Sequence, residues 1–152
     1  MMSCGELARI LSRAAAEASR ELTVPTKKVM VDVSELAKGY IGSYQPGWAP
    51  LAETTLNGWH GFPGKIELGY APPDNPLLRD GSMRASIDSQ AEPMGTGAIG
   101  VVGSNSPIAL YQEMGTSRGI PPRPFLGLAM HHSEEYATPV FGEYAVKLLT
   151  VG

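Results

Sequence analysis

Two short segments of the sequence contain residue types that could perform chemistry: GTGAIG at residues 95–100 and HHSEE at residues 131–135. Gly95, Gly97 and Gly100 have the spacing of a dinucleotide-binding fingerprint, in which a strand precedes the glycines and a helix N-terminus meets the pyrophosphate. In this chain Val101 and Val102 follow, both of which favour strands, and the βαβ context that the fingerprint requires is absent. The glycines therefore predict a β-hairpin.

The second segment offers His131 and His132 with Glu134 and Glu135 close by. Adjacent residues on a helix point about 100° apart, so two adjacent imidazoles cannot share one metal ion without a further ligand. A solvated helix face is the better interpretation. No nucleophile elbow, cysteine–histidine pair or carboxylate pair at a catalytic spacing is evident. We therefore expect no catalytic residue, no metal site and no cofactor, and hence not an enzyme.

Composition limits the number of domains, the kinds of partner and the place of synthesis that we expect. With 152 residues the chain is most simply one domain, residues 1–152, and its 18 glycines and 13 prolines predict long, shaped loops. A net charge of −3 and a pI near 5.6 give no electrostatic reason for bulk DNA binding. The single cysteine, Cys4, indicates folding inside a cell, and neither a membrane-spanning run nor a signal peptide is evident. A cytoplasmic site of synthesis follows.

Apolar spacing predicts two helices in the first third of the chain. The first covers residues 3–22 and ends before Pro25, and the second covers residues 32–44, weakened by Gly39 and Gly42. From residue 45 to 76 the chain is rich in glycine and proline, with a short helix expected within residues 50–59. We refer to residues 45–76 as the arm. Because it contains Trp48, Trp59, Phe62 and Tyr70, we expect it to be ordered, either on its own core or on a neighbouring subunit.

The second half of the chain reads as a hairpin followed by helices. Residues 83–88 alternate apolar and polar side chains and predict a strand, and residues 98–102 predict its partner after a turn at 93–97. Helices are expected at 107–114 and after Pro124, whereas Pro139 and Gly142 interrupt the chain before a strand or last helical turn at 144–151. The fold class is therefore α+β, with an N-terminal helix and further helices packed on a small, mostly antiparallel sheet.

Residues 109–129 form the most unusual segment, ALYQEMGTSRGIPPRPFLGLA. A helical turn with Tyr111 and Glu113 stops at Gly115, a loop with Arg118 follows, and two prolines prevent helix until Pro124. Prolines on both sides hold Arg123 still, and an arginine so held suits a fixed grip on a carboxylate or on backbone oxygens. We expect Glu113, from the same or an adjacent subunit, to be its partner.

Four segments in order resemble the tail-component and virion-morphogenesis proteins of tailed phages. These are the tryptophan-x-proline-leucine segment at residue 48, PLLRDGSMRASI at 76–87, GSNSPIALYQEMGT at 103–116, and PPRPFL at 121–126. Pro76, Leu77, Gly81, Ser86 and Ile87 match the family residue by residue in the second of them. The resemblance covers residues 48–129, a little over half of the chain.

This resemblance implies a structural protein of the virion at the head-tail junction or in the tail: a connector, a tail-completion protein or a minor tail component. Such a protein would be assembled in the bacterial cytoplasm as a ring, a hexamer or a dodecamer, and would dock on neighbouring head-tail or tail proteins. DNA contact would be passive at most, through Lys27, Lys28 or Arg118. The residues expected at a subunit or partner interface are Trp48, Trp59, Phe62, Tyr111, Glu113, Arg118, Arg123 and Phe125.

Two alternatives stay open at this point. A small cytoplasmic enzyme or ligand-binding domain could use a pocket near Tyr111, Glu113 and Arg123. An adaptor of a phage-derived contractile machine without a genome would share the phage-like motifs.

Overall fold

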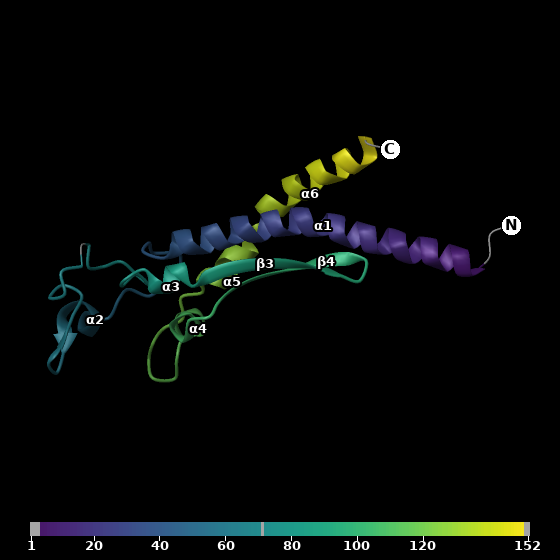
Figure 1. Cartoon of the computed structure of the whole chain (residues 1–152). Helices are drawn as coiled ribbons and strands as arrows, with labels where there is room; N and C mark the ends of the chain where they lie inside the picture. The colour runs from purple at the N-terminus through teal and green to yellow at the C-terminus, as the bar shows by residue number, and fades with distance from the viewer. Residues whose placement is uncertain (1–3, 71, 151–152) are drawn as a thin grey trace. The chain divides into compact units, whose positions relative to one another are not determined.

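The computed structural model describes residues 4–70 and 72–150, and these separate into two compact units (Figure 1). Unit 1 contains residues 4–34, 88–103 and 130–150, and unit 2 contains residues 35–87 and 104–129. Both helices and short antiparallel ribbons are present, which confirms the α+β class. Whether the two units fold as the expected single domain stays a prediction. Within the described residues, no helix is long and apolar enough to cross a membrane.

The N-terminal helix α1 runs from Cys4 to Tyr40 without a break, so the prediction of two helices separated at Pro25 was wrong. An internal proline removes one backbone hydrogen bond and costs about 3 kcal/mol in an exposed helix. Here Pro25 is buried, and the hydroxyls of Thr23 and Thr26 donate to the carbonyls of Ser19 and Leu22 at 2.9 and 2.7 Å. Burial of the Pro25 ring against the rest of the chain offsets part of this cost.

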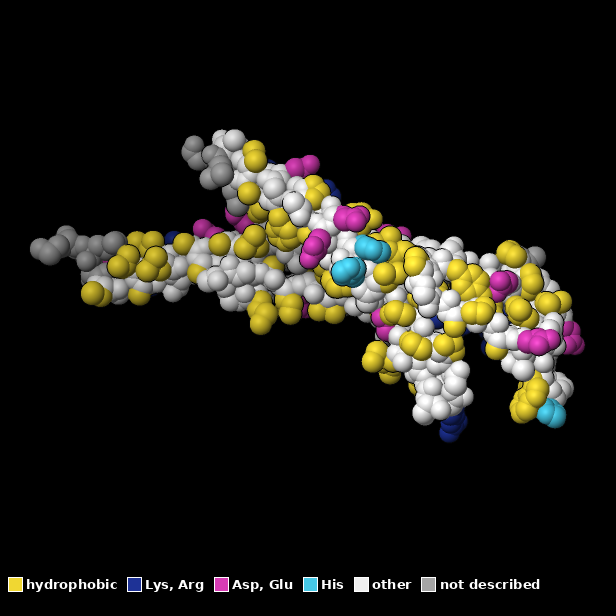
Figure 2. All heavy atoms as spheres, turned by 180° about the vertical axis from the view of Figure 1, so that it is seen from behind, with side chains coloured by type: hydrophobic (Ala, Val, Ile, Leu, Met, Phe, Trp, Pro, Cys, Tyr) yellow, Lys and Arg dark blue, Asp and Glu magenta, His cyan; other side chains and the backbone are white. Residues whose placement is uncertain are grey.

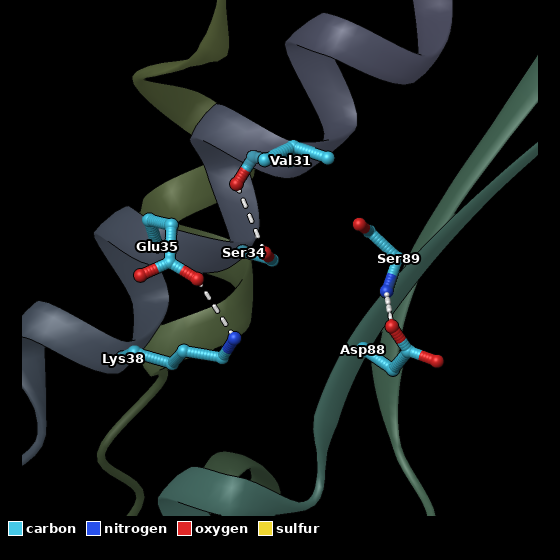
Figure 3. Close-up of polar contacts among 6 residues, drawn as sticks. All are labelled: Val31, Ser34, Glu35, Lys38, Asp88 and Ser89. Atoms are coloured by element: carbon cyan, nitrogen blue, oxygen red, sulfur yellow. Dashed lines mark hydrogen bonds and ion pairs between the residues drawn. The ribbon is translucent and has the colours of Figure 1, made fainter.

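Polar side chains of α1 also make local contacts, as Figure 3 shows. The Ser34 hydroxyl donates to the Val31 carbonyl at 2.9 Å, and Lys38 forms a salt bridge with Glu35 at 2.8 Å. Bonds of this kind, within one helical turn, stabilise the helix locally by a few tenths of a kcal/mol. The fold must therefore be held mainly by contacts between elements.

In unit 1 a β-hairpin packs on α1. Strands β3 (Ile87–Met94) and β4 (Gly97–Ser104) pair across a turn at Gly95, whose φ of 60° lies in the left-handed region. Gly100 lies so close to Met30 and Thr26 that a β-carbon there would overlap both side chains. The Ser19 hydroxyl donates to the Gly97 carbonyl at 2.5 Å. The predicted hairpin is thus confirmed, and the glycines of GTGAIG serve a turn and close packing.

The hairpin begins later than expected, because residues 82–85 form the short helix α3 (Ser82–Ala85) instead of a strand. The Asp80 carboxylate accepts hydrogen bonds from the backbone N–H and hydroxyl of Ser82, at 3.0 and 2.6 Å. These bonds satisfy donors at the start of a helical turn. A local hydrogen-bonded turn between Asp80 and Ser82 therefore overrode the alternating pattern of Met83, Ala85 and Ile87.

The remaining helices are α2 (Glu53–Asn57), α4 (Pro107–Met114), α5 (Phe125–His131) and α6 (Ser133–Thr150). The first three agree with the predicted positions. Helix α6 contradicts the expected interruption, because it continues through Pro139 and Gly142, and the Thr138 hydroxyl donates to the Glu134 carbonyl at 3.0 Å. The strand option for residues 144–151 is therefore wrong as far as Thr150, and residue 151 lies outside the described residues.

Each unit has its own small core. In unit 1 the buried side chains of α1 include Val29, Met30 and Val33. In unit 2 Phe125 is the largest fully buried side chain, and the other buried apolar side chains are Ala37, Ile41, Pro76, Met83, Ile87, Ala109 and Ala129. The core of unit 2 fixes the place where α4, α5 and the arm meet, and this junction contains most of the predicted site residues.

Candidate functional site

Glu113 caps helix α5. It lies in the last turn of α4, and its carboxylate accepts the backbone N–H groups of Leu126 at 2.9 Å and Gly127 at 2.7 Å. These are free donors at the start of α5, where a negative charge is also favoured by the helix dipole. A β-carbon on Gly127 would lie 3.0 Å from the Glu113 Oε1 atom, so glycine allows the close approach. Glu113 is therefore committed to holding α4 against α5.

Arg123 anchors the arm. Its side chain is 4% exposed, and its guanidinium donates to the Ala49 carbonyl from Nε at 3.3 Å and from Nη2 at 3.0 Å, and to the Pro50 carbonyl at 3.1 Å. Its backbone N–H donates to the Gln112 carbonyl at 2.6 Å. The grip on backbone oxygens is confirmed, whereas the expected pairing with Glu113 is absent within the chain. The reason is that helix capping uses both oxygens of Glu113.

The loop that carries Arg118 is closed by its own backbone. Thr116 donates to the Ile120 carbonyl at 2.9 Å, and Gly119 donates to Thr116 at 3.1 Å. A β-carbon on Gly115, whose φ is 71°, would lie 2.8 Å from the Ile120 oxygen. Glycine is therefore needed where helix α4 stops, and Arg118 is presented on an exposed, structured turn.

The middle of the arm forms a short two-stranded ribbon that carries two aromatic side chains. Strands β1 (Gly58–Trp59) and β2 (Phe62–Pro63) pair antiparallel with Trp59 opposite Phe62, and His60 and Gly61 form the turn with φ values of 47° and 83°. Trp59 is 64% exposed and Phe62 74% exposed. We call Trp59 and Phe62 the arm tip. Figure 2 shows hydrophobic side chains on the projection at the lower right of the view.

Backbone hydrogen bonds close the base of this ribbon. Lys65 donates to the Thr55 carbonyl and Ile66 donates to the Leu56 carbonyl, both at 3.0 Å. Gly64 lies so close to Leu56 and Gly58 that a β-carbon there would overlap their backbone atoms. The arm tip is therefore held in place within the chain itself, as a preformed element of unit 2.

Unit 2 also contains an open cavity of about 620 Å³. Its lining includes Leu51, Lys65, Tyr70, Asn75 and Gln112. The Lys65 ammonium donates to the Asn75 carbonyl at 2.5 Å and lies 5.8 Å from the centre of the Tyr70 ring. Burial lowers the pKa of Lys65, and the nearby charge of Asp74 opposes that shift. The Gln112 Oε1 atom is buried and has no hydrogen-bond partner in the structure.

The predicted interface residues fall into two groups in the structure. Trp59, Phe62, Tyr111 and Arg118 are exposed, while Trp48 and Glu113 are half-buried. Arg123 and Phe125 are covered by their own chain, so they contribute to internal packing here. The pocket expected near Tyr111, Glu113 and Arg123 does not match the cavity lining, which contains none of the three. The interface role of the exposed residues stays a prediction.

Sequence reasoning missed three features of this region: the carbonyls of Ala49 and Pro50 as the acceptors of Arg123, the pairing of Trp59 with Phe62, and the bond of the Lys65 ammonium to the Asn75 carbonyl. The second had a readable signal, because His60 and Gly61 between two aromatic residues suit a two-residue hairpin turn. The other two depend on contacts between distant segments, for which single-sequence patterns carry no signal.

The described residues contain no group of three or more histidine, cysteine, aspartate or glutamate side chains arranged to hold a metal ion. His131 ends α5 and Glu134 and Glu135 lie in the first turn of α6, so the HHSEE segment is divided between two helices. No family model, no curated protein and no solved structure matches this chain.

Proposed function

We propose that this chain is a structural protein of a tailed phage, a connector, tail-completion protein or minor tail component at the head-tail junction or in the tail. It acts by self-association into a ring, a hexamer or a dodecamer, and by docking on neighbouring virion proteins. The support from sequence is the ordered series of phage-like motifs between residues 48 and 129. In this proposal the chain is part of the virion, is assembled in the bacterial cytoplasm and has no catalytic role.

The observation that carries the proposal is the preformed, exposed arm tip. Trp59 and Phe62 face each other across a two-residue turn and together leave most of their aromatic surface in water. Large aromatic side chains at the centre of protein interfaces commonly contribute about 2 kcal/mol or more each. Because Arg123 fixes the base of the arm and backbone bonds fix its ribbon, the tip is ready to bind with little ordering cost.

Measurement of particle mass in solution tests this proposal. Wild-type protein should form a discrete oligomer by light scattering coupled to size exclusion, and the double variant Trp59→Ala/Phe62→Ala should shift to smaller species. Leu110→Ala is the matched control, because Leu110 is also 61% exposed but lies on α4 outside the arm. Unchanged mass in the arm-tip variant, or a wild-type monomer, would contradict ring formation through the arm.

Weak contact with DNA belongs to the same proposal. Lys27, Lys28 and Arg118 are exposed, but the net charge of −3 opposes tight binding to phosphates. In a gel-shift titration with random duplex at near-physiological salt we expect no binding at nanomolar concentrations and a weak, salt-sensitive shift at most. Nanomolar affinity would indicate a protein that handles DNA actively.

A second candidate, a ligand-binding protein, is favoured by the cavity beside Lys65. The side chains of Lys65 and Gln112, which both line this cavity, would suit a small ligand that carries a carboxylate and an amide group. A thermal-shift screen with amide and carboxylate fragments tests this candidate. Stabilisation that disappears in Gln112→Leu would support it, whereas no stabilising fragment would leave the assembly role preferred.

A further inference from the structure

Hydrogen bonds join the two ends of the arm. The Gly42 backbone N–H, just before the arm, donates to the carbonyl of Pro76, a fully buried residue, at 2.8 Å. Nearer to the tip, the Tyr44 hydroxyl donates to the Asp74 carboxylate at 2.5 Å. Burial and this bond both raise the pKa of Tyr44, so the phenol keeps its proton at neutral pH. The arm is therefore a loop that Tyr44 closes from one end to the other.

The same hydroxyl also binds the first half of the arm. It accepts the backbone N–H of Leu51 at 2.9 Å. The carbonyls of the two preceding residues, Ala49 and Pro50, are bound by Arg123. Two side chains from distant parts of the sequence thus hold three consecutive residues of the arm. Because a tyrosine side chain has two χ angles and a rigid ring, Tyr44 restricts the positions of both of its partners.

The contacts of Tyr44 lie between the folded body of unit 2 and the arm tip. Helix α2 begins at Glu53, two residues after Leu51, and β1 with Trp59 follows the helix directly. Most of the chain between Leu51 and the tip is therefore regular secondary structure. A change of direction at Leu51 would move the tip as a unit.

We propose that Tyr44 is the positioning residue of the arm: through Asp74 and Leu51 it fixes the direction in which unit 2 presents the arm tip. Tyr44 does this without touching the bound partner. The inference rests on the proposed assembly through the arm tip, because the direction of the tip then matters to function. An arm that is already held in one direction loses less conformational entropy on binding than an arm that is free to turn.

A second tie in the arm does not replace Tyr44. The Lys65 ammonium donates to the Asn75 carbonyl and lies beside the Tyr70 ring, and all three residues belong to the returning half of the arm. The lysine side chain is also a flexible four-carbon stem. It therefore does not join the start of the arm to its end. Loss of the Tyr44 bonds should free the first half of the arm even where the Lys65 bond remains.

Trypsin cleavage measures how firmly the arm is held, because Lys65 is the one basic residue between positions 45 and 76. Tyr44→Phe and Asp74→Ala should each raise the rate of cleavage after Lys65 about fivefold, since each removes hydrogen bonds that hold the arm. Asp74→Asn should stay close to the wild-type rate, because an amide oxygen also accepts a phenol hydrogen. Tyr70→Phe is the matched control, since the Tyr70 hydroxyl has no hydrogen-bond partner among the described residues.

Cleavage after Arg84 is the internal reference. Arg84 lies in α3 of unit 2, outside the arm, and its guanidinium binds the Ile41 carbonyl. Its cleavage rate should stay that of the wild type in all four variants. An equal rise at Lys65 and Arg84 would mean that unit 2 unfolds as a whole, and it would overturn the positioning role. An unchanged rate at Lys65 in Tyr44→Phe would overturn it as well.

Assembly is measured separately, by light scattering over a range of protein concentrations. Tyr44→Phe should raise the concentration at which the oligomer dissociates about fivefold, and Asp74→Asn should not. The cleavage rates are repeated in the Trp59→Ala/Phe62→Ala background, in which the arm tip cannot protect the arm through assembly. A wild-type monomer would overturn the proposed function and the role of Tyr44 in assembly, while the cleavage rates would still show whether Tyr44 holds the arm. A freer arm with unchanged assembly would overturn this inference alone.

Discussion

Each of the two units of this protein is stabilised internally by a different kind of contact. Unit 1 depends on close approach: a hairpin lies so near α1 that Gly100 has no room for a β-carbon beside Met30. Unit 2 depends on buried polar groups: Arg123 binds the carbonyls of Ala49 and Pro50, and Glu113 binds the first N–H groups of α5. Apolar contacts stabilise a structure without requiring a particular orientation, whereas hydrogen bonds require that the two groups have a particular distance and angle. Unit 2, which contains the arm, is therefore the unit whose geometry depends on hydrogen bonds.

Removing the arginine anchor should have the largest effect on stability. Arg123→Ala leaves two buried carbonyls without their donor and removes a well-packed side chain, so we expect a loss of about 3 kcal/mol in denaturant unfolding. Arg123→Lys should recover only part of it, because a single ammonium cannot reproduce the fork. A loss below about 0.5 kcal/mol would show that unit 2 does not depend on this polar anchor.

Overpacking the hairpin tests unit 1 in the same way. Gly100→Val should cost about 2 kcal/mol, because the new side chain has to displace Met30 and Thr26 from a close-packed contact. Gly103→Ala is the control in the same strand, since a β-carbon at Gly103 meets nothing within 4 Å. Equal stability of the two variants would mean that close approach does not hold the hairpin on α1.

The helix cap should contribute less than the arginine. Glu113→Ala removes two charge-assisted hydrogen bonds at the start of α5, and a cap of this kind is worth about 1 kcal/mol. Because Glu113 and Arg123 have separate partners, the double variant should lose the sum of the two single losses to within about 0.5 kcal/mol. A larger coupling energy in the double-mutant cycle would contradict separate partners and would support the direct pairing of Glu113 with Arg123.

The smallest expected effect is a pH dependence from Lys65. Burial lowers its pKa below the usual 10.5, so the unfolded state binds more protons than the folded state in the interval between the two values. Stability should therefore rise slightly as the pH increases through that interval towards 10.5. Lys65→Met should flatten this rise in denaturant titrations at several pH values. An unchanged slope would assign the pH dependence to other groups.

Particular residues explain which parts of the fold could be predicted. The bounds of α4 agree with the prediction because Pro107 suits the first helical turn and Gly115 supplies the left-handed stop. The prediction was wrong at Pro25 and Pro139, because both prolines lie inside helices that continue past them. In α1 the ring of Pro25 is buried, and threonine hydroxyls bind carbonyls near both prolines. Such offsets come from packing and from local bonds that an apolar pattern does not report.

By itself the sequence determined the α+β class, the hairpin, the glycine-bearing turns and the division of α4 from α5, because each follows from backbone preferences of nearby residues. Tertiary structure alone decided the partners of Arg123 and Glu113. Both side chains could reach several acceptors or donors, and the choice depends on which distant segments the two cores bring within hydrogen-bonding distance. Long-range proximity is a property of the packed chain, and the backbone preferences of neighbouring residues do not report it.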